Sequence, residues 1–173
     1  MGGDMATISA AAFGVKCGLV RAARVRFCGP FFESDGDEPA LIFPILAASH
    51  ICAGAGCAGH DLVGQPVELV DAAAWAPDQW ERVALYRGMA DCLGEWCLCH
   101  DWKPLSVWAT PASWAAHDCD GIVIVDWHRM PAKLLGHLQV ICETLALATR
   151  LDQAIRAAHA RTFPAIPEIL IAT

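Results

Sequence analysis

Charged residues are scarce in this sequence, at 18% of 173 positions, while hydrophobic residues make up 55%. A disordered chain has the opposite profile, so we expect a folded chain that is long enough to bury a sizeable core. Basic residues are scarcer than acidic ones: 12 Lys and Arg against 19 Asp and Glu give a formal net charge of −7. Because an acidic domain repels the phosphate backbone, direct nucleic-acid binding is not expected.

No secretory signal is expected either, since Asp4 lies where a signal peptide would have its basic segment. One uncharged window, residues 40–60, is about as long as a membrane span. Pro44, His50 and the glycines in this window give it at best a weak tendency to insert, so no membrane association is expected. The cysteine count is nine, an odd number, in a chain too long to need disulfides. We therefore expect a cytoplasmic protein with mostly free, buried thiols.

The strongest fold signal lies between Pro104 and Met130. An apolar run at Leu105–Ala109 is followed by Thr110 and Pro111, a good N-cap and first helical residue. A second apolar run, Ile122–Val125, follows the turn at Asp120 and Gly121 and shows no alternation, as in a strand covered on both faces. This pattern predicts a β-α-β unit and, for residues 1–173, a single α/β domain with a small, mostly parallel sheet flanked by helices.

Other segments carry weaker signals. Alternation at Arg24–Phe27 predicts a strand, Phe31–Pro39 reads as an exposed turn or loop, and Ala40–Ala48 as a buried strand or short helix. Helical spacing predicts a helix from Pro77 to about Gly94. Within 131–161 we expect helix, strand and helix, with the strand at Leu145–Ala148 and a new helix from Thr149; one unbroken helix is the alternative. A terminal strand is predicted at Glu168–Ala172.

Two clusters of metal-ligating residues stand out. The denser one consists of His50, Cys52, Cys57 and His60, whose thiolates and imidazoles are the ligands that zinc prefers. Its spacing matches no common structural zinc pattern, and buried thiols explain it more simply. The second cluster, Cys92, Cys97, Cys99 and His100, converges on one point only if the predicted helix ends before it. No cofactor is expected, with zinc on the first cluster as the open alternative.

A candidate catalytic pair, Asp126 and His128, ends the central strand. In open parallel sheets, ligands lie outside the carboxyl ends of the strands, so this position suits chemistry. Asp118 and Asp120 lie at the entering end of the same strand and should not join the pair. If a hairpin formed at Asp120 instead, the segment would resemble a metal-dependent nuclease core in which His128 replaces the usual lysine.

No glycine-rich phosphate loop or serine nucleophile motif is present. Seven tryptophans are unusual for this length, and most should pack in or near the core, with some available as interface anchors.

A resemblance covers about Val67–Val125. Its first part is Val70–Trp75 with Trp80, Arg87–Ala90 and Leu93–Glu95; its second part is Val107–Pro111, Trp114 and Cys119–Val123. These segments resemble a group of uncharacterised small proteins of proteobacterial prophages and other mobile elements. The resemblance implies a genetic setting and no activity.

We therefore expect a non-catalytic cytoplasmic interaction or accessory protein that binds an unidentified protein partner. The first alternative is a metal-dependent hydrolase or nuclease that uses Asp126 and His128. The second is a structural zinc module on His50, Cys52, Cys57 and His60.

Overall fold

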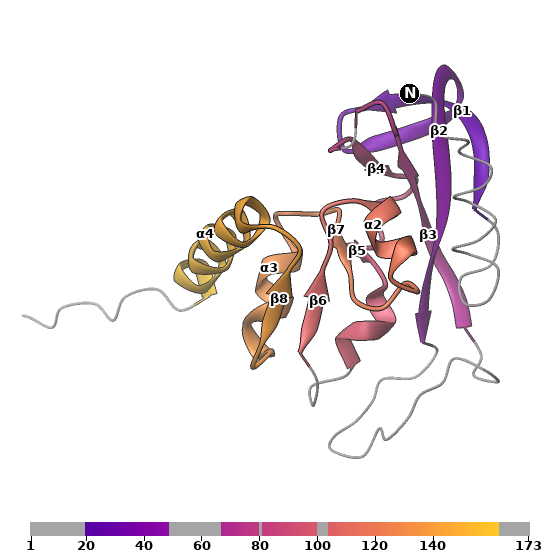
Figure 1. Cartoon of the computed structure of the whole chain (residues 1–173). Coiled ribbons are helices and arrows are strands. Elements are labelled where there is room, and N and C mark those ends of the chain that lie inside the picture. Colours follow the sequence, from indigo (N-terminus) through magenta and orange to yellow (C-terminus); the bar gives the residue numbers. More distant parts are fainter. Residues whose placement is uncertain (1–19, 49–66, 80, 100–103, 163–173) are drawn as a thin grey trace, which may run out of the picture.

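The computed structural model describes residues 20–48, 67–79, 81–99 and 104–162 (Figure 1). The first half of the described chain forms a four-stranded sheet in the order β1-β2-β3-β4. Its strands are β1 (Arg21–Cys28), β2 (Phe31–Ala48), β3 (Val67–Trp75) and β4 (Val83–Leu85). The three neighbouring pairs are antiparallel, and a single parallel pairing, Phe31 with Leu85, also joins β2 to β4. The predicted α/β fold with a mostly parallel sheet is therefore wrong.

Strand β1 confirms the strand predicted at Arg24–Phe27. Val25 and Phe27 are buried while their neighbours are exposed, which is the alternation that a half-covered strand requires. Gly29 follows with a φ of 64°, a left-handed conformation that glycine adopts without strain, and the chain reverses there into β2.

The loop predicted at Phe31–Pro39 is wrong, because β2 runs through it. The turn signal nevertheless marks a real irregularity: Val25 pairs with Glu38 and Arg26 with Glu33, so residues 34–37 bulge out of the ladder. Gly36 packs so closely there that a Cβ atom would lie 2.0 Å from the Val25 carbonyl carbon. The strand alternative for Ala40–Ala48 is confirmed as the second part of β2.

The helix predicted from Pro77 to Gly94 is also wrong. A turn follows β3, in which the Ala76 amide donates to the Arg82 carbonyl at 3.1 Å, and the chain then forms β4 and β5 (Cys92–Leu93). Gly88 and Gly94 have φ values of 69° and 77°, which no right-handed helix accommodates. The helical spacing of apolar residues here comes from packing on two different sheets.

A second, mixed sheet forms in the other half. Antiparallel β5 and β7 (Val123–Ile124) pair at one side, while β6 (Leu105–Val107) pairs in parallel with β8 (Val140–Cys142). A parallel bridge between Val107 and Ile122 joins the two pairs, which gives the order β5-β7-β6-β8.

Helix α2 (Pro111–Ala116) connects β6 to β7, so the local β-α-β unit is present although the fold class is not. Thr110 caps α2 as predicted, with its Oγ1 3.0 Å from the Ser113 amide. Of the apolar run, Ile122, Val123 and Ile124 are buried and Val125 is half-buried.

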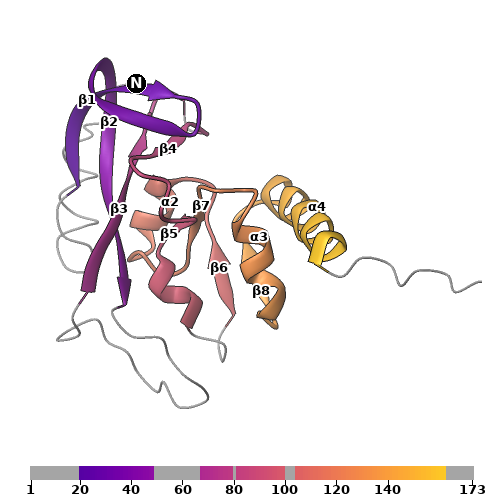
Figure 2. The same ribbon diagram turned by 180° about the vertical axis from the view of Figure 1, so that it is seen from behind.

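The C-terminal part has helix, strand and helix in that order, but the strand lies earlier than predicted. Helix α3 (Met130–Lys133) and the short 3-10 helix η2 (Leu134–Gly136) precede β8, and α4 (Leu145–Thr162) follows it. The predicted strand at Leu145–Ala148 is instead the first turn of α4, because Thr144 caps this helix: its Oγ1 accepts the Leu147 amide at 3.1 Å. Seen from behind, α3 lies over β8 (Figure 2). The strand predicted at Glu168–Ala172 lies outside the described residues.

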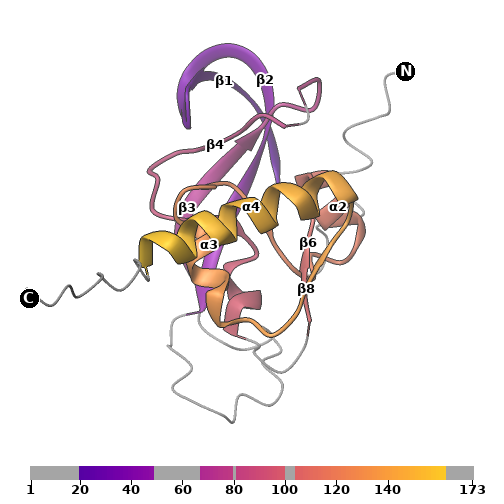
Figure 3. The same cartoon turned by 90° about the vertical axis from the view of Figure 1, so that its left-hand side faces the viewer.

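The two sheets share a core. Phe43 and Ile45 of β2 belong to the same buried cluster as Leu93, Trp114 and Val123 of the second half. Trp114 is 1% exposed, and its indole donates to the Gly121 carbonyl at 2.9 Å. Along α4, which crosses α3 in Figure 3, Leu147 and Leu151 close a second cluster. Within the described residues, no helix is long and apolar enough to cross a membrane.

Candidate functional site

The predicted zinc ligands, His50, Cys52, Cys57 and His60, lie outside the described residues, and zinc binding there stays a prediction. In the part of the chain that the structure describes, no group of three or more His, Cys, Asp or Glu residues could hold a metal ion.

The second cluster is described only in part, through Cys92 and Cys97, which are buried. The Cys97 sulfur accepts the Gly121 amide at 3.3 Å. Burial, followed by the nearby Glu95 charge, raises the pKa of Cys92 well above its usual value. Because the thiolate is the nucleophile and the metal ligand, this protonated thiol is a core side chain.

Asp126 lies two residues after the end of β7, and its carboxylate is held by its own chain. Oδ1 accepts the amides of His128 and Arg129 at 2.8 and 3.0 Å, and Oδ2 lies 2.6 Å from Arg129 Nε. Burial by itself would raise the pKa of Asp126, but the hydrogen bonds from Arg129 and His128 outweigh burial and lower it. The contact between the two predicted catalytic residues therefore runs through the His128 amide.

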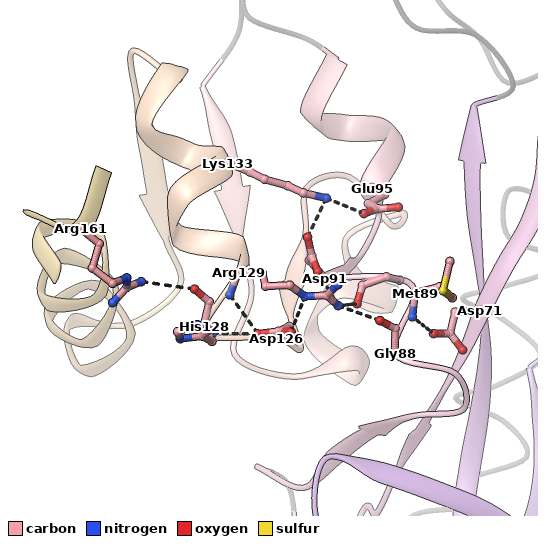
Figure 4. A network of polar contacts seen from close by, with 11 residues as sticks. Asp71, Gly88, Met89, Asp91, Glu95, Asp126, His128, Arg129, Lys133 and Arg161 are labelled. Atoms are coloured by element: carbon pink, nitrogen blue, oxygen red, sulfur yellow. Dashed lines mark hydrogen bonds and ion pairs between the residues drawn. The ribbon is translucent and has the colours of Figure 1, made fainter. Parts of the chain in front are cut away.

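A second carboxylate, that of Asp91, lies between β4 and β5 and is only 3% exposed. Arg129 Nη2 lies 2.8 Å from its Oδ1, and Lys133 Nζ lies 2.7 Å from its Oδ2 (Figure 4). Lys133 also pairs with Glu95 at 3.2 Å. The network thus contains two cations, Arg129 and Lys133, and three acids: Asp91, Glu95 and Asp126. It therefore has no excess positive charge for an anionic ligand.

Arg129 also binds the backbone that leads to Asp91. Its Nη2 donates to the carbonyls of Gly88 and Ala90 at 2.8 and 3.1 Å. The buried Asp71 of β3 holds the same segment from the other side, accepting the amides of Arg87 and Met89 at 2.9 and 2.8 Å. The segment from Arg87 to Asp91 is therefore fixed on both sides by charge-assisted hydrogen bonds, which are stronger than neutral ones.

Large apolar side chains are exposed on the fixed segment and beside it. Tyr86 is 50% exposed, Met89 is 65% exposed, and Phe31, paired with Leu85, is 45% exposed. The Phe31 ring lies against Gly88, where a Cβ atom would come within 2.7 Å of it. We call the three exposed residues Phe31, Tyr86 and Met89 the Tyr86 patch; the Tyr86 ring packs on the buried Phe32, with 5.6 Å between the ring centres.

The patch was not predicted from the sequence, because a helix was predicted over Tyr86 and Met89 where the structure has a turn. The usable signal was Gly88 beside Tyr86, Arg87 and Met89, residue types that are enriched in interfaces. The five described tryptophans are buried or half-buried, as predicted for most of them: Trp75, Trp96, Trp108, Trp114 and Trp127.

No family model, no curated protein and no solved structure matches this chain. The resemblance to proteins of prophages and mobile elements therefore stays a prediction.

Proposed function

We propose that this chain is a non-catalytic accessory protein that binds a protein partner through the Tyr86 patch. One observation carries the proposal: two buried carboxylates and one arginine hold a loop that exposes Met89, with the exposed Tyr86 just before it. Networks of this kind fix a backbone in one conformation. Fixing the backbone before binding reduces the entropy that association would otherwise cost.

The chemistry of the patch favours a protein partner. Tyrosine supplies a large, rigid contact area, and methionine adapts its shape to different apolar surfaces. The Arg87 guanidinium lies 5.9 Å from the centre of the Tyr86 ring and adds a donor at the rim. A small core of apolar side chains with a polar rim is the usual composition of a protein interface.

The same geometry supports a structural role for the Asp126 carboxylate. It holds Arg129, and Arg129 holds the Gly88 carbonyl under the Tyr86 patch. A cytoplasmic location is part of the proposal, and described cysteines that form no disulfide support it: Cys28, Cys92 and Cys142.

The test is capture of the partner by tagged parent protein, followed by comparison of three variants. Met89→Lys and Tyr86→Ala should lower the captured amount about tenfold or more, since truncation of a central interface residue costs about 2 kcal/mol or more. Leu69→Lys is the matched control, because Leu69 is a 63% exposed apolar residue of β3 outside the patch. It should capture as much as the parent.

Asp71→Asn is an independent test, because it changes the hydrogen bonds that hold the loop and leaves the residues of the patch unchanged. An asparagine keeps one acceptor oxygen but turns a donor towards either Met89 or Arg87, so the loop loses one of its bonds. Capture should fall while the protein stays folded. Undiminished capture by Met89→Lys would place the interface elsewhere, and a hydrolytic activity abolished by Asp126→Asn would make the chain an enzyme.

A further inference from the structure

Strand β8 is the outer strand of the second sheet, as Figure 1 shows. The Gln139 carbonyl and the Glu143 amide bond to β6, to Leu105 and Val107, each at 3.0 Å. Amide and carbonyl groups of successive strand residues point to opposite sides. Val140 and Cys142 therefore turn theirs away from β6, towards a side on which none of the described strands pairs.

This edge lacks the protection that outer strands usually carry. Strand β1, at the edge of the first sheet, has Arg21, Arg24 and Arg26 along it, and such charges discourage pairing with another chain. Strand β8, Val140–Cys142, has no charge and no proline. Exposed apolar residues lie on the strand and on either side of it instead: Ile141 at 57%, Leu138 at 91% and Leu145 at 83%.

We propose that the β8 edge pairs in antiparallel fashion with the β8 edge of a second copy of this chain. The outward groups of Val140 and Cys142 fix the register. Val140 of each copy faces Cys142 of the other, which gives four backbone hydrogen bonds around a two-fold axis. Ile141 then faces Ile141 of the second copy as a non-hydrogen-bonded pair, with Cα atoms about 4.5 Å apart.

A second copy fits this edge because the exposed Ile141 lies at its centre and an exposed leucine lies on each side of it, Leu138 and Leu145. In this register Leu138 lies opposite Thr144 of the second copy, next to the exposed Leu145 that begins α4. An isologous interface requires such self-complementarity, whereas a foreign strand does not. Because the ladder is only three residues long, the dimer belongs to the weak, concentration-dependent class.

Sedimentation equilibrium over a range of concentrations tests the association. The parent should show a monomer–dimer equilibrium, and Ile141→Lys should weaken it about tenfold or more, because a lysine on an edge strand opposes pairing. Leu69→Lys is the control: it puts the same charge on an exposed strand position of the first sheet and should dimerise like the parent. Because Ile141 is exposed, Ile141→Lys should melt at the parent's temperature. A parent that is monomeric throughout, or equal dimerisation of parent and Ile141→Lys, overturns the proposal.

Cross-linking tests the register. Two cysteines at Cα atoms about 4.5 Å apart can form a disulfide, so Ile141→Cys should give a covalent dimer when oxidised glutathione is added. Mass spectrometry should find a peptide that joins position 141 to position 141. The parent, treated in the same way, controls for the native cysteines. Cross-links only through native cysteines would overturn the register. The Tyr86 patch lies on other elements, so Met89→Lys should dimerise normally, and the two proposals can fail separately.

Discussion

The guanidinium of Arg129 lies 2.8 Å from the buried carboxylate of Asp91, and the same Nη2 atom donates to the Gly88 carbonyl. One side chain, just before α3, thereby connects the end of β7 to the segment between β4 and β5. The network that resembles a catalytic cluster in Figure 4 is, by its contacts, a support for the backbone of that segment.

Arg129→Met should destabilise the fold. Removing one partner of a fully buried pair costs about 3–5 kcal/mol. Arg129 is 45% exposed and Lys133 still neutralises Asp91, so we expect a smaller loss, about 2 kcal/mol, in urea unfolding.

Arg156→Met is the matched control for this loss. Arg156 pairs with Asp152 on the exposed face of α4, and exposed pairs contribute little, so no measurable change is expected. Equal stabilities of the two variants would show that Asp91 does not depend on Arg129.

Thr110→Ala should cost about 1 kcal/mol, because the Ser113 amide loses its acceptor at the start of α2. Thr110→Ser keeps the hydroxyl and should be nearly neutral. Chemical denaturation of both variants checks this, and equal stability of the two would mean that the cap contributes nothing.

Parts of the fold with local physical causes could be predicted from the sequence. Thr110 and Pro111 specify the start of α2 by their own chemistry, and the alternation at Val25 and Phe27 reflects one covered face. Likewise, the unalternated run at Ile122–Ile124 correctly indicated a strand buried on both sides.

The remaining parts depend on distant partners. The apolar spacing around Leu85 looked helical, but Asp71, some 16 residues earlier than Arg87, takes the amides that a helix would need. Thr144 could have been identified as a helix cap, which would have moved the predicted strand to Val140–Cys142. Nothing local to Arg129 indicates that it reaches Gly88, 41 residues away.

Val123→Asp should prevent soluble expression. Val123 is 2% exposed in β7 and packs in the core that joins the two sheets, so an aspartate there would be a buried charge without a partner. The cost of several kcal/mol is comparable to the whole stability of a small domain. Soluble yield measures the effect, and Ile141→Asp, on the exposed face of β8, should remain soluble.

The stability of the protein should depend on the charge of Asp126 at low pH. Hydrogen bonds from Arg129 and His128 lower its folded-state pKa despite the opposing effect of burial. A lowered folded-state pKa gives stability that is present above the unfolded-state value, near 3.9 for aspartate, and is lost as the pH falls through the folded-state pKa. In urea unfolding from pH 7 downward, the free energy of unfolding should therefore fall more steeply for the parent than for Asp126→Asn. The amide oxygen of this variant still accepts the backbone bonds.

Salt separates this effect from that of an exposed ion pair. The pKa of Asp152 is also lowered, chiefly by the hydrogen bond from Arg156, but both side chains are exposed. In 1 M salt, where charges are screened beyond about 3 Å, the difference between the parent and Asp152→Asn should shrink towards zero. The difference between the parent and Asp126→Asn should persist, because it rests on the 2.6 Å pair with Arg129, in which the Asp126 side chain is only 25% exposed, and salt screens partly buried pairs much less than exposed ones. If salt removed both differences equally, Asp126 would act only as a surface charge, and its support of Arg129 would contribute nothing to the fold.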